Sequence, residues 1–235
     1  MKMFDPNGPL MIALGKLADI VICNIMFCLF SLPVITIGAS TTALFYACMK
    51  LQGDEGYPTA NYFRSFRENF RQATIIWLIY AAVGALLVYG LIFWNLMDGT
   101  TLRVGHAFAI AILIPYGLSL LYVFAIQAKF VNGVRDTIHY ALILPIKHFG
   151  WTLQMVILVG VVIYLNVTTI VWTNFLTLTV GIGWIAYLLS IYFMRVFERY
   201  IPKTVETEEA EEPKEFNWEG QAQEPAEAGP DTPQA

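Results

Sequence analysis

Three cysteines and three histidines are the residues of this 235-residue chain that could bind a metal ion or act as nucleophiles. They are Cys23, Cys28, Cys48, His106, His139 and His148. The cysteines share the first apolar segment, where five residues of helix would turn Cys23 and Cys28 about 140° apart. No histidine has a Cys, a Glu or a second His at the spacing of metal ligands. The sequence therefore predicts no catalytic residue, no metal and no cofactor.

A cluster of hydroxyl side chains around a proline is a second candidate site. Residues 31–42 read SLPVITIGASTT and carry five hydroxyls within an otherwise apolar run. Pro33 removes a backbone donor and disfavours helical geometry at Leu32, so we expect a kink or a break there. In lipid the freed carbonyls need donors, which the hydroxyls could supply. We predict a kink and packing motif, and a solute site at the break is the alternative. The residues are Ser31, Pro33, Thr36, Gly38, Ser40 and Thr41.

An arginine-rich segment, ANYFRSFRENFRQA at residues 60–73, is the best-patterned stretch of the chain. At 100° per residue its aromatic side chains share one arc of a helix and its arginines another. This pattern is typical of an amphipathic helix in the membrane interface, so we expect Arg64, Arg67 and Arg71 to contact anionic lipid headgroups or a partner. Three arginines beside a membrane span are a poor footprint for nucleic acid, and we predict no nucleic-acid partner.

The elements that position these residues are apolar segments. Apolar residues make up 57% of the chain, which exceeds what a soluble domain of this size needs. Four stretches without Asp, Glu, Lys or Arg are long enough to cross a bilayer, which takes about 20 helical residues. They are 74–95, 106–128, 152–172 and 175–194. The run at 17–49 would make about 50 Å of helix, too long for one straight span, while each half is too short. We predict one kinked span there; a hairpin that re-enters is the alternative.

The distribution of charge predicts the orientation and the domain boundary. Residues 202–235 hold ten acidic side chains against Lys203 and Lys214, so we expect a disordered acidic tail after a membrane domain at 1–201. Lys and Arg gather in the segments 50–71 and 129–147 and after the last span, which predicts that these sides and the C-terminus are cytoplasmic. Five spans place the N-terminus outside. Lys2 and Lys16 are the exceptions, and a hairpin at 17–49 would bring them inside.

The sequence also resembles a known family. Asn24, the stretch SLPVITIGASTTALFY and the stretch FRSFRENFRQATIIWL, all within residues 17–80, resemble the signature of the YesL-like family of bacterial integral membrane proteins, a domain of unknown function. Genes of that family often lie beside genes of carbohydrate ABC transporters. The resemblance therefore implies an accessory role in sugar uptake, with transporter subunits as partners, and assigns no catalytic or ligand-binding residue.

Together these features predict an all-α, polytopic transmembrane helical bundle of about five spans in the bacterial cell membrane. We expect no enzyme, since the spans lack ionisable groups that could do chemistry. The function expected is that of an accessory or regulatory protein of a carbohydrate uptake system. A small transporter or channel for an uncharged solute is the alternative. The sequence leaves the oligomeric state open.

Overall fold

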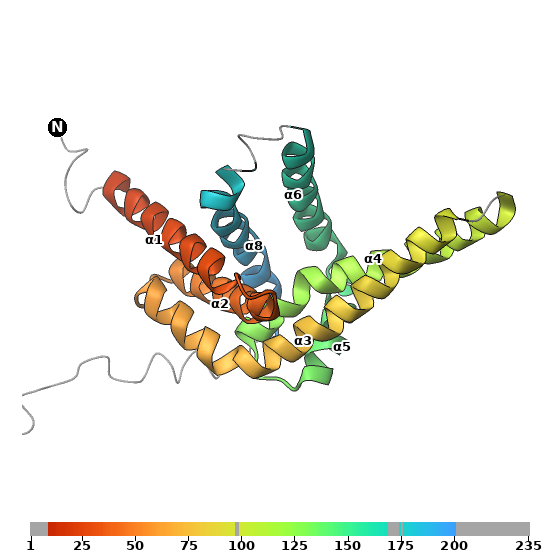
Figure 1. Ribbon diagram of the computed structural model, residues 1–235. Helices are drawn as coiled ribbons and strands as arrows, with labels where there is room; N and C mark the ends of the chain where they lie inside the picture. Colours follow the sequence, from red (N-terminus) through yellow and green to blue (C-terminus); the bar gives the residue numbers. More distant parts are fainter. Residues whose placement is uncertain (1–8, 97–98, 169–173, 175, 201–235) are drawn as a thin grey trace, which may run out of the picture. The chain divides into compact units, whose positions relative to one another are not determined.

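The computed structural model describes residues 9–96, 99–168, 174 and 176–200, and every regular element in these ranges is a helix (Figure 1). The elements are α1 (Pro9–Phe30), the 3₁₀ turn η1 (Val34–Thr36), α2 (Ile37–Gln52), α3 (Pro58–Asn95), α4 (Gly99–Lys129), α5 (Val134–Lys147), α6 (Phe149–Thr168), the π-helix η2 (Thr177–Gly181) and α8 (Ile182–Phe197). Within these ranges, six helices are long and apolar enough to cross a membrane. This confirms an all-α, multi-pass helical bundle.

The first apolar run differs from the single kinked span expected at 17–49. It begins at Pro9 and forms two helices, because the chain turns at residues 31–33, where Pro33 is extended (φ −74°, ψ 113°). Lys16 on α1 forms an ion pair with Asp54 after α2, with 2.8 Å between Lys16 Nζ and Asp54 Oδ1. The first half of α1 therefore lies beside the end of α2, and the two helices run antiparallel. This is the hairpin alternative, and it places Lys16 beside the loop that follows α2.

The predicted interfacial helix at 60–73 and the predicted span at 74–95 form one continuous helix. α3 runs for 38 residues, about 57 Å at 1.5 Å per residue, which is nearly twice the ~30 Å of a hydrocarbon core. In Figure 1 its orange first part and its yellow second part run in different directions. The first part packs along α2, and the second part packs against α4. The interfacial segment is thus tied to the protein by the helix that follows it.

The core of unit 1, Met1–Glu198, lies around α2. α2 contacts α1, α3, α4 and α8, and small buried residues such as Ala39, Ala43 and Ala47 line its faces. Small side chains let helix backbones approach closely, which is how helices associate where lipid replaces water. Aromatic rings close one end of this core: Phe193 on α8 packs edge-on against both Phe45 and Tyr122, with centroids 5.5 and 5.0 Å away.

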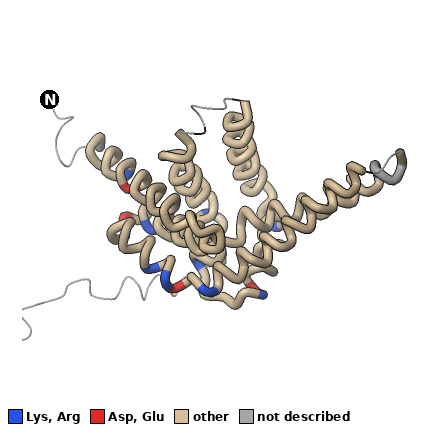
Figure 2. Tube along the Cα trace, in the orientation of Figure 1, with Lys and Arg blue, Asp and Glu red and all other residues tan. Residues whose placement is uncertain are grey.

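The cations of unit 1 lie mostly at one end of the helices. Lys50 of α2 and Lys129 of α4 line one small cavity together with Met194 of α8, so the ends of these three helices meet. Figure 2 shows Lys and Arg gathered around the α2–α3 and α4–α5 connections. Arg103, near the start of α4, lies at the opposite end of that helix from Lys129. Lys16, the described cation that did not fit the predicted charge distribution, lies beside Asp54. It is therefore at the same end of the helices as Lys50 and Lys129, which we call the basic end.

The predicted acidic tail at 202–235 lies outside the described residues. The chain divides after Glu198 into two units, and the second unit is Arg199–Ala235. Parts of the predicted spans at 152–172 and 175–194 also lie outside the described residues, at 169–173 and 175.

Candidate functional site

The hydroxyls of Thr36 and Ser40 bond to backbone carbonyls at the end of α1 and in the turn that follows it. Thr36 Oγ1 donates to the carbonyls of Phe30 and Pro33, at 2.6 and 2.7 Å. Ser40, fully buried on α2, donates to the carbonyl of Phe27 at 3.2 Å. Carbonyls at a helix end have no intrahelical donor, and leaving them unpaired away from water is costly. Thr36 therefore supplies a donor to the last carbonyl of α1, and Ser40 adds a second donor to a carbonyl that the Ser31 amide already pairs.

The other residues of the motif differ in their roles. Thr41 Oγ1 bonds back to Ile37 O of its own helix at 2.7 Å. Gly38 is buried where α2 crosses α3: a Cβ there would lie 2.5 Å from Trp77 Cβ and 2.6 Å from Ala73 O. The Ser31 hydroxyl has no hydrogen-bond partner among the described residues. The residues of the motif thus form the turn between α1 and α2, and this turn packs closely against α3.

Two aromatic residues of α3 complete this junction. Tyr62 is fully buried, and its hydroxyl lies 2.6 Å from Ser40 Oγ. The indole of Trp77 donates to the carbonyl of Val34 at 2.8 Å. Tyr62 was expected on the apolar face of an interfacial helix; in the structure its ring is enclosed by protein. The residue types could have indicated these hydrogen bonds, because a buried Tyr hydroxyl or Trp indole N–H needs a hydrogen-bond partner.

Asn24 is a buried residue whose contacts the sequence did not predict. Its side chain is 1% exposed and links α1 to the start of the last span. Asn24 Nδ2 donates to the carbonyls of Leu178 and Thr179 at 2.9 and 2.7 Å, and Asn24 Oδ1 accepts from the Gly183 amide at 2.8 Å. These carbonyls belong to the π-helix η2, and π-helical turns often occur at functional sites. One amide thus pairs three backbone groups of a distant segment.

The arginine face, which we define as Arg64, Arg67 and Arg71, points away from the core. All three side chains are exposed. Arg64 pairs with Glu68 one turn later, at 3.1 Å between Nε and Oε1, whereas Arg67 and Arg71 have no ion-pair partner within the described part of the chain. Exposed pairs of this kind contribute little stability. These cations are therefore available to a ligand outside the chain.

The aromatic side of the same segment is divided between protein and surroundings. The ring of Phe30, at the end of α1, packs against Phe63 and Phe66 with centroids 5.4 and 5.0 Å away. Phe63 and Phe70 still expose 51% and 41% of their surface. The sequence pattern predicted that this aromatic side faces lipid. The exposed rings of Phe63 and Phe70 still require an apolar environment such as lipid, whereas the protein covers the rest.

A second polar cluster fixes the arginine segment to the end of α4. Gln127, 3% exposed, donates to Asn69 Oδ1 at 2.9 Å and accepts from the Thr137 hydroxyl at 3.2 Å. Gln72 donates to the carbonyl of Asn132 in the α4–α5 loop. This cluster holds the polar edge of the arginine segment against α4 and α5. It was not predicted, because its members are about 60 residues apart in the sequence.

The described residues contain no group of three His, Cys, Asp or Glu side chains that could hold a metal ion. The three cysteines are free thiols on α1 and α2.

Comparison with known proteins gives one match. Residues 20–91 match the model of a family described as "Protein of unknown function, DUF624". The matched range contains Asn24, the break motif and the arginine face. Neither a curated protein nor a solved structure matches the chain. The matched family thus has no described activity, and the YesL-like name stays a resemblance.

Proposed function

We propose that this chain is a non-enzymatic integral membrane protein that serves as an accessory or regulatory component of a bacterial carbohydrate uptake system. Its partners in this proposal are subunits of a carbohydrate ABC transporter, bound on the cytoplasmic side. The resemblance of residues 17–80 to the YesL-like family supports the choice of partner. The arginine face supports the place of contact.

The observation that carries the proposal is a pair of exposed arginines that have no acidic partner among the residues the structure describes. Arg67 and Arg71 lie on a segment that the Gln127 cluster and the Ser40–Tyr62 contact hold in place. A rigid, positively charged surface favours an acidic partner surface, because complementary charge steers association and suppresses wrong partners. The same cations suit anionic headgroups, so membrane contact and partner contact can share this face.

The geometry of the break supports an accessory role over a solute pathway. A solute site needs polar groups that are free to bind, and the hydroxyls of Thr36 and Ser40 are already bonded to backbone carbonyls. In the motif, only the Ser31 hydroxyl has no partner among the described residues. Ser40 also contacts Tyr62, so both are occupied within the bundle. The transporter alternative therefore serves as an outcome of the test below.

Charge reversal at two positions of the arginine face should strongly weaken partner binding. We expect the tagged protein, solubilised from native membranes, to recover carbohydrate transporter subunits. The double variant Arg67→Glu/Arg71→Glu should recover at least tenfold less, because like charges in a contact cost several kcal/mol and ~1.4 kcal/mol is tenfold. Quantitative mass spectrometry of the recovered proteins measures this. Arg103→Glu, at the other end of the bundle, is the matched control and should recover wild-type amounts.

The proposal fails if the double variant and the Arg103→Glu control recover equal amounts of transporter subunits. It also fails if the wild-type protein recovers none. Flux of an uncharged sugar into liposomes that contain this protein alone would instead establish the transporter alternative.

A further inference from the structure

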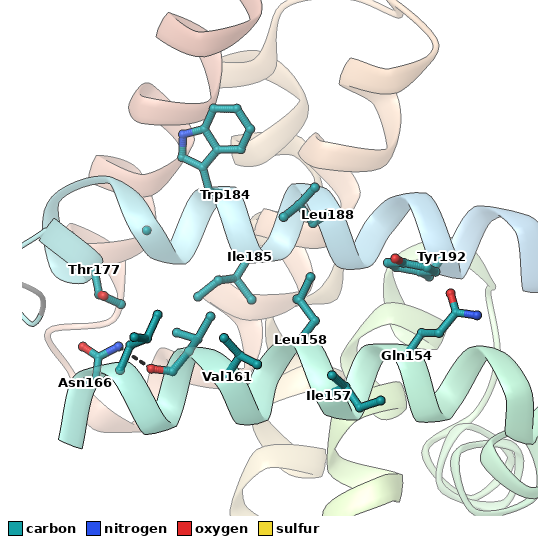
Figure 3. Close-up of a pocket in the computed structure, with 13 residues that line it drawn as sticks. Gln154, Ile157, Leu158, Val161, Asn166, Thr177, Trp184, Ile185, Leu188 and Tyr192 are labelled. Atoms are coloured by element: carbon teal, nitrogen blue, oxygen red, sulfur yellow. Dashed lines mark hydrogen bonds between the residues drawn. The ribbon is translucent and has the colours of Figure 1, made fainter. Parts of the chain in front are cut away.

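A groove lies between α6 and α8. It has a volume of about 660 Å³ and is lined mostly by aliphatic side chains, including Ile157, Val161 and Ile185 (Figure 3). α6 is largely exposed along its length, and its contacts with α8 are sparse compared with those around α2. The side chains of the two helices therefore do not fill the apolar groove between them.

The two ends of this groove differ in polarity. Figure 3 shows Gln154 and Tyr192 together at one end, with Asn166 and Thr177 at the other. Among the described residues, neither the Gln154 amide nor the Tyr192 hydroxyl has a hydrogen-bond partner, whereas Asn166 Nδ2 donates to Val162 O of its own helix at 2.8 Å. The end at Gln154 and Tyr192 thus offers free donors beside a long apolar channel.

That same end carries the charge. Arg195 lies one turn beyond Tyr192 on α8, and its guanidinium stacks over the ring of Trp151, 5.4 Å from the centroid. Trp151 lies one turn before Gln154 on α6 and contacts the Tyr192 ring, 6.0 Å away. Tryptophan and tyrosine with an adjacent cation are typical of the membrane–water interface. Residues 152–194 contain no charged side chain, so the rest of the groove is uncharged.

We propose that this groove binds one anionic phospholipid, with an acyl chain along α6 and α8 and the phosphate at Gln154, Tyr192 and Arg195. The length agrees: the twelve residues from Gln154 to Asn166 rise about 18 Å, close to the ~15 Å depth of one leaflet. The charge agrees too, because an arginine with two neutral donors suits a phosphate oxygen. A helix from a second copy of the chain is a less suitable occupant, because the polar groups lie at one end of the groove only.

The opposite side of α6 provides a built-in contrast. A second hollow of about 560 Å³ lies between α4 and α6, and its lining contains only aliphatic residues and glycines. It offers nothing that could orient a headgroup. A Cβ at Gly160, which lines this hollow, would meet no atom within 4 Å, so a larger side chain fits there without disturbing the helices.

Native mass spectrometry of the intact purified protein, incubated with phosphatidylglycerol or with phosphatidylcholine, tests the proposal. We use an Arg64→Gln/Arg67→Gln/Arg71→Gln background so that lipid on the arginine face does not count. We expect one phosphatidylglycerol to bind at least tenfold more tightly than phosphatidylcholine. Arg195→Gln should lower phosphatidylglycerol affinity about tenfold, and Arg195→Lys should restore most of it. Val161→Trp, which fills the groove, should abolish binding, whereas Gly160→Leu should leave it unchanged.

Equal binding by Val161→Trp and Gly160→Leu would overturn the acyl-chain site. An unchanged ratio of the two lipids in Arg195→Gln would overturn the headgroup site. If Val161→Trp is not recovered folded, the Arg195 pair of variants decides alone. A wild-type protein that appears as a dimer, and that Val161→Trp converts to a monomer without change in bound lipid, would assign the groove to a second copy and contradict the proposal.

Discussion

Replacing Asn24 by leucine should lower the free energy of unfolding by about 2 to 5 kcal/mol. The change removes three hydrogen bonds, to Leu178 O, Thr179 O and the Gly183 amide, and bonds between helices in membranes contribute roughly 0.6 to 1.7 kcal/mol each. Leucine is close to asparagine in size, so packing changes little. The loss should be large because Asn24 is 1% exposed, so water cannot easily replace its side chain as the partner of these three backbone groups.

Thermal unfolding of the protein in detergent measures this effect, and we expect the Tm to fall by about 5 to 15 °C. Asn166→Leu is the matched control, because Asn166 donates only to a carbonyl of its own helix, which already has a helical partner. If Asn24→Leu and Asn166→Leu unfold at the same temperature, the link between α1 and the last span does not stabilise the bundle.

Replacing Gly38 by alanine should be nearly as damaging, although alanine is the better helix former. The added Cβ would lie 2.5 Å from Trp77 Cβ and 2.6 Å from Ala73 O, and one of these contacts is with backbone, so α2 and α3 must move apart. Overpacking of this kind costs about 1 to 3 kcal/mol. The Ser40–Tyr62 and Trp77–Val34 hydrogen bonds should weaken together with the packing.

The same unfolding experiment compares Gly38→Ala with Gly117→Ala. Gly117 is also inside a helix, but a Cβ there meets no atom within 4 Å. Alanine should therefore stabilise that site by up to about 1 kcal/mol. A Gly38→Ala protein that is at least as stable as wild type would show that α2 and α3 do not need this close approach.

Local chemistry made part of the fold predictable. The stretches at 74–95 and 106–128 are apolar and long enough to span, and both lie within helices of the structure. Pro33 predicted the break correctly, because the local chemistry of proline also causes it: proline lacks a backbone donor and has a fixed φ. The direction of the chain after the break was not predictable, because it depends on contacts such as Lys16–Asp54 that form only once α1 and α2 are antiparallel.

The site was predictable in kind but not in its partners. Hydroxyls near a proline indicated bonding to freed carbonyls, and Thr36 makes such a bond to Phe30 O, whereas Ser40 bonds to a carbonyl that already has a backbone donor. Asn24 gave no local signal, because its partners are more than 150 residues away. The α6–α8 groove is equally absent from any sequence pattern, since it arises from the spacing of two helices whose residues are similarly apolar.

The proposed docking role requires the arginine face and the open end of the α1–α2 hairpin to lie in the cytoplasm. Single cysteines test this directly: Lys16→Cys, Arg67→Cys and Arg103→Cys, each in a chain whose Cys23, Cys28 and Cys48 are replaced by alanine. An impermeant maleimide added to intact cells should label Arg103→Cys, and should label Lys16→Cys and Arg67→Cys only after the membrane is permeabilised. Labelling of Arg67→Cys in intact cells would contradict the cytoplasmic docking surface, and labelling of Lys16→Cys alone would contradict the hairpin.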